Sequence, residues 1–364
     1  MPRDPIRISI IVPVYNSPLE LYECLSALLA PAHHELEILV VDDASTDATP
    51  TVATQMGVRV LQLAENAGPA AARNYGARHA RGEILFFVDA DVVVAPGAID
   101  HVLTLFEEHY DVAAVFGSYD ASPRAKGIVS QYRNLLHHFV HQNGNSKAST
   151  FWAGCGAIRR SVFEAIGGFD EKRFPRPSIE DIDLGYRLRK AGYRILLDKA
   201  LQGTHLKQWT LRSIIQTDIC NRALPWARLI LESRHIPNDL NLKLEQRLSG
   251  VLVMLAALFL LLSVVRVELF AFSVAALFSV VVLNRKLYLF FFQKGGLHFA
   301  AMCLPLHFLY YLYSGLSYLY VRIGFQLIKV HRWIWPLSFG EESNWQLRAG
   351  KLRDLIALLR GVIK

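Results

Sequence analysis

The 364-residue sequence lacks the short motifs that mark the commonest nucleotide-binding enzymes. No GxGxxG segment follows its first apolar stretch and no GxxxxGK[ST] segment occurs, which argues against a dinucleotide oxidoreductase and a P-loop ATPase. The four cysteines, Cys24, Cys155, Cys220 and Cys303, include no CxxC pair. The sequence therefore favours reduced thiols in a cytosol-facing protein over a disulfide framework or a zinc site.

Apolar residues are distributed unevenly along the chain. Residues 1–235 have the composition of a globular domain, residues 236–325 are far more apolar, and residues 326–364 form a basic tail. The first seven residues contain no apolar segment of the kind that a signal peptide requires. The formal net charge of +7 suits a membrane surface or an anionic ligand.

Alternating strand and helix patterns predict an α/β domain at the N-terminus. Buried strands are expected at 7–16, where Pro13 would end the strand, and at 36–43, 58–63, 83–94 and 112–117. Helices are expected at 19–29, from about 45, from about 66, at 126–142 and at 178–191. This alternation predicts a mainly parallel sheet flanked by helices, with right-handed crossovers.

Paired carboxylates end two of these strands: Asp42 with Asp43, and Asp89 with Asp91. In an extended chain Asp89 and Asp91 face the same side, and a buried strand face cannot hold two free carboxylates. We therefore expect them at the carboxyl edge of the sheet, where open α/β sheets bind ligands, with a divalent cation relieving their repulsion. The alternative is that both carboxylates cap a following turn.

A further candidate carboxylate begins the helix at 178–191. Asp181 could form a capping box with Ser178, which would be a purely structural role. Alternatively it is a general base beside the segment 172–177, whose two prolines indicate a mobile loop that can close over substrate. The first-turn position is expected to lower the pKa of Asp181 through the helix dipole.

Two histidines lie four residues apart on the helix expected at 126–142. His137 and His141 could share a metal, but no acidic residue lies near them in the sequence. A basic helix with aromatic edges, lying near a membrane or lining an acceptor groove, is the preferred interpretation.

Together, and in this order, the motifs resemble glycosyltransferase family 2, whose fold is the GT-A nucleotide-sugar fold. The resemblance covers roughly residues 6–210. It is carried by Val12-Pro13-Val14-Tyr15-Asn16, Asp42-Asp43, Asn66-Ala67-Gly68, Ala72-Arg73-Asn74, Asp89-Ala90-Asp91, Gly167-Gly168-Phe169-Asp170 and Glu180-Asp181.

The resemblance implies a role for each matching residue. The nucleotide sugar would be bound by Pro13, Tyr15, Asn16, Asp42, Asp43, Asn66, Gly68, Arg73 and Asp89, with the base, uracil, on Asp42 and Asp43 and the ribose on Asp89. The acceptor would be bound by Trp152, Gly154, Glu180 and Trp209. Asp91 would hold Mg²⁺ or Mn²⁺ on the diphosphate, and Asp181 would deprotonate the acceptor hydroxyl, giving inversion at the anomeric carbon.

One departure from the family pattern bears on processivity. Processive members carry Gln/Arg-x-x-Arg-Trp after the base, where this chain has His205-Leu206-Lys207-Gln208-Trp209. Trp209 is kept and Gln208 replaces the arginine, which favours a non-processive enzyme. His205 is a candidate second metal ligand or diphosphate contact, and the alternative is a core histidine.

The apolar region predicts membrane segments. A hairpin is expected at about 249–283, an interfacial segment at about 287–296, and a third apolar run, containing Pro305, at about 297–321. Basic residues flanking the hairpin place the catalytic domain in the cytoplasm, at the cell (inner) membrane. The third run either spans or is re-entrant, and an amphipathic helix at 347–363 on the inner leaflet would favour the second arrangement.

The sequence thus predicts a membrane-anchored, metal-dependent, inverting hexosyltransferase. It would move a sugar from a nucleotide-sugar, a UDP-sugar, to a hydroxyl of a lipid or lipid-linked glycan, and we expect no nucleic-acid partner. The alternatives are a polyprenyl-phosphate glycosyltransferase, a non-catalytic membrane scaffold of the same fold, and a transporter. The few apolar segments and the absence of charge in their middle argue against a transporter.

Overall fold

The computed structural model describes residues 6–30 and 35–334, with side chains as far as residue 327. Residues 1–321 form one compact unit and residues 322–364 a second. The amphipathic helix expected at 347–363 lies outside the described residues, as does most of the basic tail.

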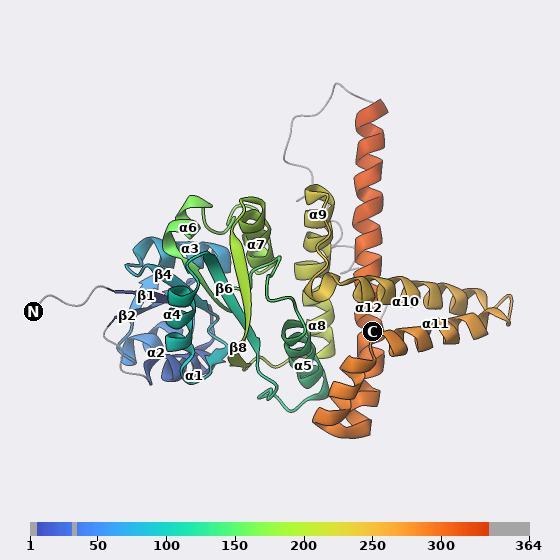
Figure 1. Cartoon of the computed structure of the whole chain (residues 1–364), viewed down its shortest axis with the longest axis horizontal. Helices are drawn as coiled ribbons and strands as arrows, with labels where there is room; N and C mark the ends of the chain where they lie inside the picture. Colours follow the sequence, from blue (N-terminus) through green and yellow to red (C-terminus); the bar gives the residue numbers. More distant parts are fainter. Residues whose placement is uncertain (1–5, 31–34, 335–364) are drawn as a thin grey trace, which may run out of the picture. The chain divides into compact units, whose positions relative to one another are not determined.

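An eight-stranded mixed sheet organises the N-terminal part (Figure 1). Its order is β3-β2-β1-β4-β7-β6-β8-β5. The strands are β1 (Ile8–Val14), β2 (Leu36–Asp42), β3 (Arg59–Gln62), β4 (Ile84–Val88), β5 (Val92–Val94), β6 (Val112–Tyr119), β7 (Cys155–Arg159) and β8 (Arg194–His205). The strands β3, β2, β1 and β4 are parallel, β7 is antiparallel to β4 and β6, and β6 and β8 are again parallel. The predicted mainly parallel α/β sheet is confirmed.

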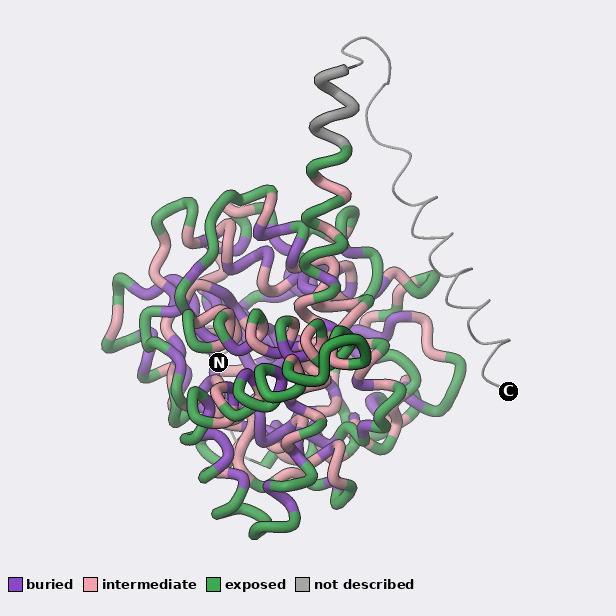
Figure 2. Tube along the Cα trace, turned by 90° about the vertical axis from the view of Figure 1, so that its right-hand side faces the viewer, coloured by how far each residue is buried: buried purple, intermediate pink, exposed green. Residues whose placement is uncertain are grey.

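Helices cover both faces of the sheet because alternate strand residues point to opposite sides. Ile8, Ile10 and Val12 of β1 join one buried cluster with α1 (Pro18–Leu29), α2 (Thr49–Gln55) and α4 (Ala98–Glu108). Ile11 joins the other with α3 (Pro69–His79), α6 (Arg160–Ala165) and α7 (Glu180–Lys190). Figure 2 shows this buried interior in purple.

Two strand predictions need correction. Pro13 does not end β1, which continues to Val14 and stays paired with β2. The pairing of β1 with β4 stops at Ile11, so no hydrogen bond of the sheet requires the N–H that proline lacks. The expected strand at 83–94 is two strands, since β4 stops at Val88 and 89–91 form a turn. The strand after that turn, β5, leaves β4 and pairs with β8.

The longest strand, β8, brings distant residues together. It has twelve residues and was not predicted from the sequence. Its apolar and polar residues alternate only weakly, and its middle carries the charged residues Asp198 and Lys199. Its last residue, His205, is the register partner of Val92. The backbone N–H of Leu206 donates to the carbonyl of Asp91 over 2.9 Å. The pairing of β5 with β8 therefore fixes His205 beside Asp91.

Helix α5 (Ile128–Gln142) joins the sheet to the C-terminal helices. It packs on β6 and β8 and shares an apolar cluster with the start of α12 (Arg285–Ile334). Beside it, α8 (Leu211–Gln216) leads into a π-helix (Thr217–Ala223) and then α9 (Leu224–Ser233). Within the π-helix, buried Asp218 accepts hydrogen bonds from Arg133 of α5, Arg222, and the hydroxyl of Tyr313 on α12.

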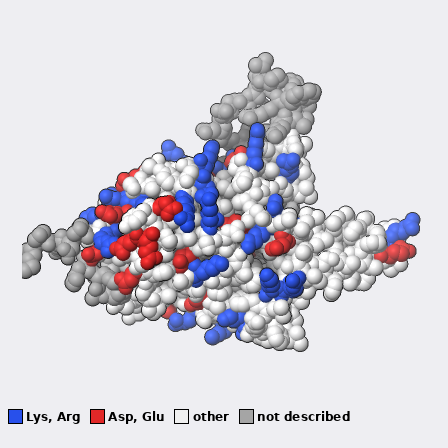
Figure 3. All heavy atoms as spheres, in the orientation of Figure 1, with Lys and Arg blue, Asp and Glu red and all other residues white. Residues whose placement is uncertain are grey.

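The C-terminal helices are apolar and mostly exposed in the isolated chain (Figure 2). After a 3₁₀ turn (Leu240–Leu242), α10 (Leu244–Leu262) and α11 (Leu269–Leu283) form a hairpin, which Figure 3 shows uncharged along its length with one basic and one acidic group at its tip. The helix α12 is broken at Gly296, whose φ is 75°. Among the described residues, Leu244–Leu262 and Arg285–Leu327 are long and apolar enough to cross a membrane, while Leu269–Leu283 is shorter.

Candidate active site

The turn after β4 presents two carboxylates with different partners. Asp89 accepts from Nη2 of Arg73 over 2.6 Å, and Nη1 of the same guanidinium reaches Glu180 over 2.9 Å. Arg73 comes from α3 and Glu180 from the first turn of α7, and both side chains are buried. One cation therefore ties Asp89 to the start of the helix that carries Asp181.

The second carboxylate of the turn, Asp91, faces an imidazole. Oδ2 of Asp91 lies 3.3 Å from Nε2 of His205, whose Nδ1 is 2.7 Å from Oδ1 of Asn134. The ring of Tyr119 stacks on His205 with centroids 4.2 Å apart and planes 9° apart. Burial acts to raise the pKa of Asp91, but the positive charge and hydrogen bond that His205 can supply outweigh burial and hold that pKa below its ordinary value.

Asp181 is not part of a capping box. The N-cap of α7 is Ile179, and the hydroxyl of Ser178 donates to the carbonyl of Asn221 instead. Asp181 accepts the backbone N–H of Ala153 at Oδ2 and of Ile182 at Oδ1, over 3.2 and 2.8 Å. Both oxygens are thus held at fixed positions.

The expected lowering of the pKa of Asp181 is wrong. Burial, followed by the negative charge of Glu180, raises it to about 7, although Arg73 and the two backbone N–H groups act in the opposite direction. Desolvation outweighs the helix dipole here because Asp181 is half-buried and not at a fully exposed helix end.

One loop connects these carboxylates. The backbone N–H of Asp89 donates to the carbonyl of Gly154 over 3.1 Å, and the neighbouring residue Ala153 donates to Asp181. Burial, followed by the negative charges of Asp91, Asp89 and Asp181, raises the pKa of Tyr119 well above its ordinary value. The structure therefore gathers the carboxylates predicted to be catalytic around one place.

The carboxylates that end β2 bind the protein's own backbone. Asp43 accepts from the N–H groups of Ala67 and Gly68 over 2.8 and 2.9 Å, and burial raises its pKa despite these bonds. Asp42 is fully buried and accepts from Ser45 and from Gln62. These two carboxylates shape the loops into which their predicted nucleotide ligand would fit.

The other predicted nucleotide contacts form the rim of the same edge. Asn16, at φ 50°, accepts from the N–H of Thr46 and donates its own N–H to Ser45. Asn66 donates to the carbonyl of Asp43. Tyr15 is exposed and follows directly on β1, the strand that contains Pro13.

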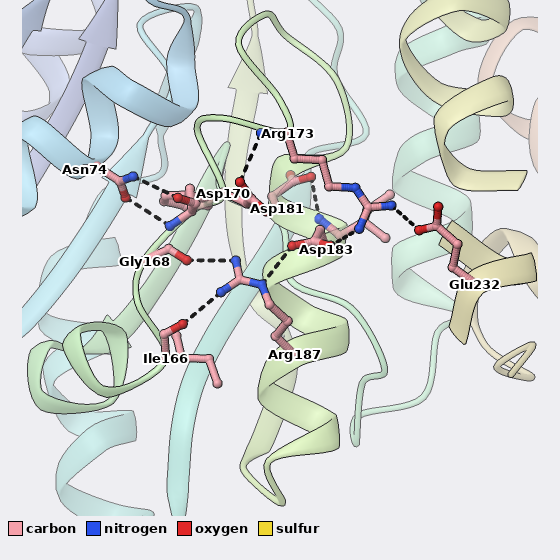
Figure 4. A network of polar contacts seen from close by, with 11 residues as sticks. Asn74, Ile166, Gly168, Asp170, Arg173, Asp181, Asp183, Arg187 and Glu232 are labelled. Atoms are coloured by element: carbon pink, nitrogen blue, oxygen red, sulfur yellow. Dashed lines mark hydrogen bonds and ion pairs between the residues drawn. The ribbon is translucent and has the colours of Figure 1, made fainter. Parts of the chain in front are cut away.

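The segment expected to be a mobile loop lies over Gly68. A Cβ on Gly68, whose φ is 87°, would fall 2.5 Å from the carbonyl oxygen of Pro175. Arg173 of this segment reaches Asp183 of α7 and Glu232 of α9. Figure 4 shows Arg173 and Arg187 converging on Asp183 next to Asp181. The loop is thereby tied to the helix that carries the predicted base.

The predicted acceptor residues lie on the α5 side of the carboxylates. Trp152 packs its ring edge-on against Tyr119 at 4.9 Å and close to His137 at 4.8 Å. A Cβ on Gly154 would lie 2.7 Å from the Trp152 ring, so glycine allows this close packing. Trp209 is 7% exposed, and the ammonium of Lys207 lies 4.6 Å from its ring centroid. The indole of Trp209 is therefore mostly covered within the protein.

Comparisons with known proteins identify the chain. A family model described as Glycosyl transferase family 2 matches residues 9–167, which include Asp89 and Asp91. This part of the chain is a glycosyltransferase family 2 domain. Glycosyltransferase GlyA of Streptococcus pneumoniae is 34% identical over 151 residues, 40% of this chain and 21% of that protein. An uncharacterized glycosyltransferase of Rickettsia typhi is 33% identical over 183 residues, 45% of this chain and 54% of that protein.

A solved structure extends the likeness beyond the family model. The mannosyltransferase PcManGT of Pyrobaculum calidifontis, in complex with GDP-Man and Mn²⁺, aligns over 88% of this chain and 90% of that chain, with a TM-score of 0.53 and 20% identity. The fold is therefore of the GT-A type, followed by long C-terminal helices. The chain matches about a fifth and about half of the lengths of the two curated relatives above.

The edge of the sheet at Asp91 fits a divalent cation at one place. Asp91 and His205 offer a carboxylate oxygen and an imidazole nitrogen facing each other at 3.3 Å. Within residues 6–30 and 35–334, no group of three or more His, Cys, Asp or Glu side chains could hold a metal alone. A cation here would need further oxygen ligands from a bound diphosphate or water. His137 and His141 stack with ring centroids 3.9 Å apart and have no carboxylate among their contacts in the described chain.

Sequence reasoning missed three contributors to the site. The Arg73–Glu180 pair spans more than a hundred residues, so no local pattern signals it. Tyr119 and Asn134 lie on β6 and α5 and reach His205 only through the position of β8. The one available signal was Asn134 itself, a polar residue on the predicted buried stripe of the helix.

Proposed function

We propose that this chain is a membrane-anchored, non-processive, inverting hexosyltransferase. It takes the sugar from a nucleotide-sugar, a UDP-sugar, and transfers it to a hydroxyl of a lipid or lipid-linked glycan at the cytoplasmic face of the membrane. Mg²⁺ or Mn²⁺ is its metal cofactor.

The observation that most supports the proposal is the joining of the donor and base carboxylates through one loop. The backbone N–H of Ala153 donates to the carboxylate of Asp181, and the carbonyl of the next residue, Gly154, accepts from the backbone N–H of Asp89. A single displacement needs the leaving group and the base on opposite sides of one anomeric carbon, within a sugar's width of each other. The shared segment 153–154, together with the Arg73 bridge from Asp89 to Glu180, supports placing these carboxylates at one site.

The residues of this chain divide the chemistry between them. Asp91 and His205 would hold the divalent cation, which when bound neutralises charge on the departing diphosphate. Asp181, oriented by the N–H groups of Ala153 and Ile182, accepts the proton of the acceptor hydroxyl. Its pKa of about 7 suits a base that works near neutral pH.

A base of this strength favours a hydroxyl acceptor. A polyprenyl phosphate is already anionic and can attack without losing a proton, so an enzyme for it has little use for a buried carboxylate with a raised pKa. The membrane part of the proposal rests on α10 and α12, whose apolar surfaces find few partners within the chain. Burial in lipid would remove these surfaces from water.

The direct test is a donor screen with the full chain in detergent. UDP- and GDP-sugars, GDP-mannose included, are incubated with Mn²⁺, and nucleotide release is measured with and without membrane lipid extract. We expect Asp91→Ala to lose donor turnover, and Asp181→Asn to bind nucleotide but not to transfer. Glu65→Gln, which changes an exposed carboxylate near the same edge, is the matched control.

Two results would contradict the proposal. Wild-type rates in Asp91→Ala would remove the donor-site assignment. A product whose sugar is linked through its anomeric carbon to phosphate would replace the hydroxyl acceptor with a polyprenyl phosphate.

A further inference from the structure

Asn134 is a buried amide whose placement the reaction above does not explain. It lies on α5, is 1% exposed, and directs Oδ1 at Nδ1 of His205 over 2.7 Å. Its Nδ2 has no hydrogen-bond partner. Burying an amide with one end unpaired costs free energy. A functional role for Oδ1, the atom that faces His205, would account for that cost.

The carbonyl of Asn134 restricts the protonation of His205. A carbonyl oxygen only accepts, so the Nδ1 that faces it carries a proton. In the neutral ring the other nitrogen, Nε2, then has a free lone pair, and this is the nitrogen that faces Asp91 at 3.3 Å. Lone pair and carboxylate repel unless a cation or a second proton lies between them. With Nδ1 engaged by Asn134, Nε2 is the ring nitrogen left to ligate a metal beside Asp91.

Two other contacts limit how the ring can move. Tyr119 stacks parallel to it, which fixes the ring plane. The backbone of His205 is paired with Val92, the first residue of β5, which directly follows Asp91. Asn134 supplies the remaining constraint, because its hydrogen bond to Nδ1 selects one of the two ring orientations that differ by a 180° flip and share the same plane.

We propose that Asn134 is a positioning residue that holds His205 as a metal ligand and thereby gives this enzyme a preference for Mn²⁺ over Mg²⁺. The inference rests on the proposed function, since it takes Asp91 and His205 as the cation site. Mg²⁺ takes oxygen ligands almost exclusively and dehydrates reluctantly, so a well-placed nitrogen benefits Mn²⁺ more. Outer residues that orient a ligating histidine typically change metal affinity by about 10–100-fold.

The experiment measures metal binding and not turnover. The full chain in detergent is saturated with UDP, or separately GDP, and titrated with MnCl₂ while the electron paramagnetic resonance signal of free Mn²⁺ is followed; Mg²⁺ is measured by competition. We expect Asn134→Ala to weaken Mn²⁺ binding by about 10-fold or more and Mg²⁺ binding by much less. Asn134→Asp keeps an acceptor opposite Nδ1 and should retain Mn²⁺ binding. Asn143→Ala, on the exposed end of the same helix, is the control.

A spectroscopic signature and a double variant separate positioning from general damage. Electron spin-echo modulation from an imidazole nitrogen on bound Mn²⁺ should be present in the wild type, weak in Asn134→Ala and restored in Asn134→Asp. In a His205→Ala background, Asn134→Ala should have no further effect on Mn²⁺ affinity.

The outcomes distinguish this inference from the proposed function. If the wild type with either nucleotide binds no Mn²⁺, the donor site itself is wrongly assigned. If it binds Mn²⁺ and Asn134→Ala does so equally well, or loses Mn²⁺ and Mg²⁺ binding to the same extent, only the role of Asn134 is refuted. A further loss of Mn²⁺ affinity when Asn134→Ala is added to His205→Ala would also refute the role of Asn134.

Discussion

Removing Arg73 should destabilise this protein more than any single hydrogen bond could. Arg73→Met keeps the length of the side chain but leaves the carboxylates of Asp89 and Glu180 without their shared cation. Glu180 is 5% exposed, so it becomes an uncompensated buried charge. Breaking a buried pair in this way costs about 3–5 kcal/mol. Since Asp89 is partly exposed, breaking its ion pair with Arg73 adds little to the loss of stability.

The assay is thermal unfolding of the full chain in detergent. At about 2 °C per kcal/mol for a large domain, we expect a fall in Tm of about 6–10 °C. The double variant Arg73→Met with Glu180→Gln removes the unpaired charge, so it should recover at least half of that loss. A fall of less than about 3 °C, or a double variant no more stable than the single one, would refute the reasoning.

Three further predictions follow from single contacts. The transfer rate should fall about tenfold per pH unit below pH 7, because Asp181 must be ionised to accept a proton and its pKa is about 7; a pH-independent rate between 5 and 7 would exclude it as the base. Asp218→Asn, which leaves two arginines facing a neutral amide, should lower Tm, and calorimetry should find the change larger than for Tyr313→Phe. Gly68→Ala should weaken nucleotide affinity in a fluorescence titration, whereas Gly57→Ala, with a similar positive φ but open space around it, should only lower Tm slightly.

The parts of the fold that sequence predicts well are those set by local pattern. Ile8 to Val14, Leu36 to Asp42 and Ile84 to Val88 are mostly apolar runs, and each forms a buried parallel strand within two residues of its expected start. The carboxylates at 42–43 and 89–91 lie at the carboxyl ends of these strands, because strand direction fixes which edge they reach.

What sequence could not predict depends on pairing across long distances. The division of 83–94 into two strands follows from β5 meeting β8, more than a hundred residues later. The raised pKa of Asp181 likewise follows from desolvation in the folded protein and from the charge of Glu180, not from its position on the helix. A helix terminus visible in sequence gives the sign of the dipole effect, but only the folded structure gives the larger effect of desolvation.

Two successive residues of α5 connect the donor carboxylates to the apolar helices. Arg133 donates to Asp218, which also accepts from Tyr313 of α12, and Asn134 faces His205 beside Asp91. Neighbouring residues on a helix point about 100° apart, so one turn of α5 contacts α12 on one side and the donor site on the other. A displacement of α12 that moves Arg133 must therefore also move Asn134. A site geometry held to about 0.5 Å would be altered by such a displacement, so α12 is coupled through α5 to the pair formed by His205 and Asp91.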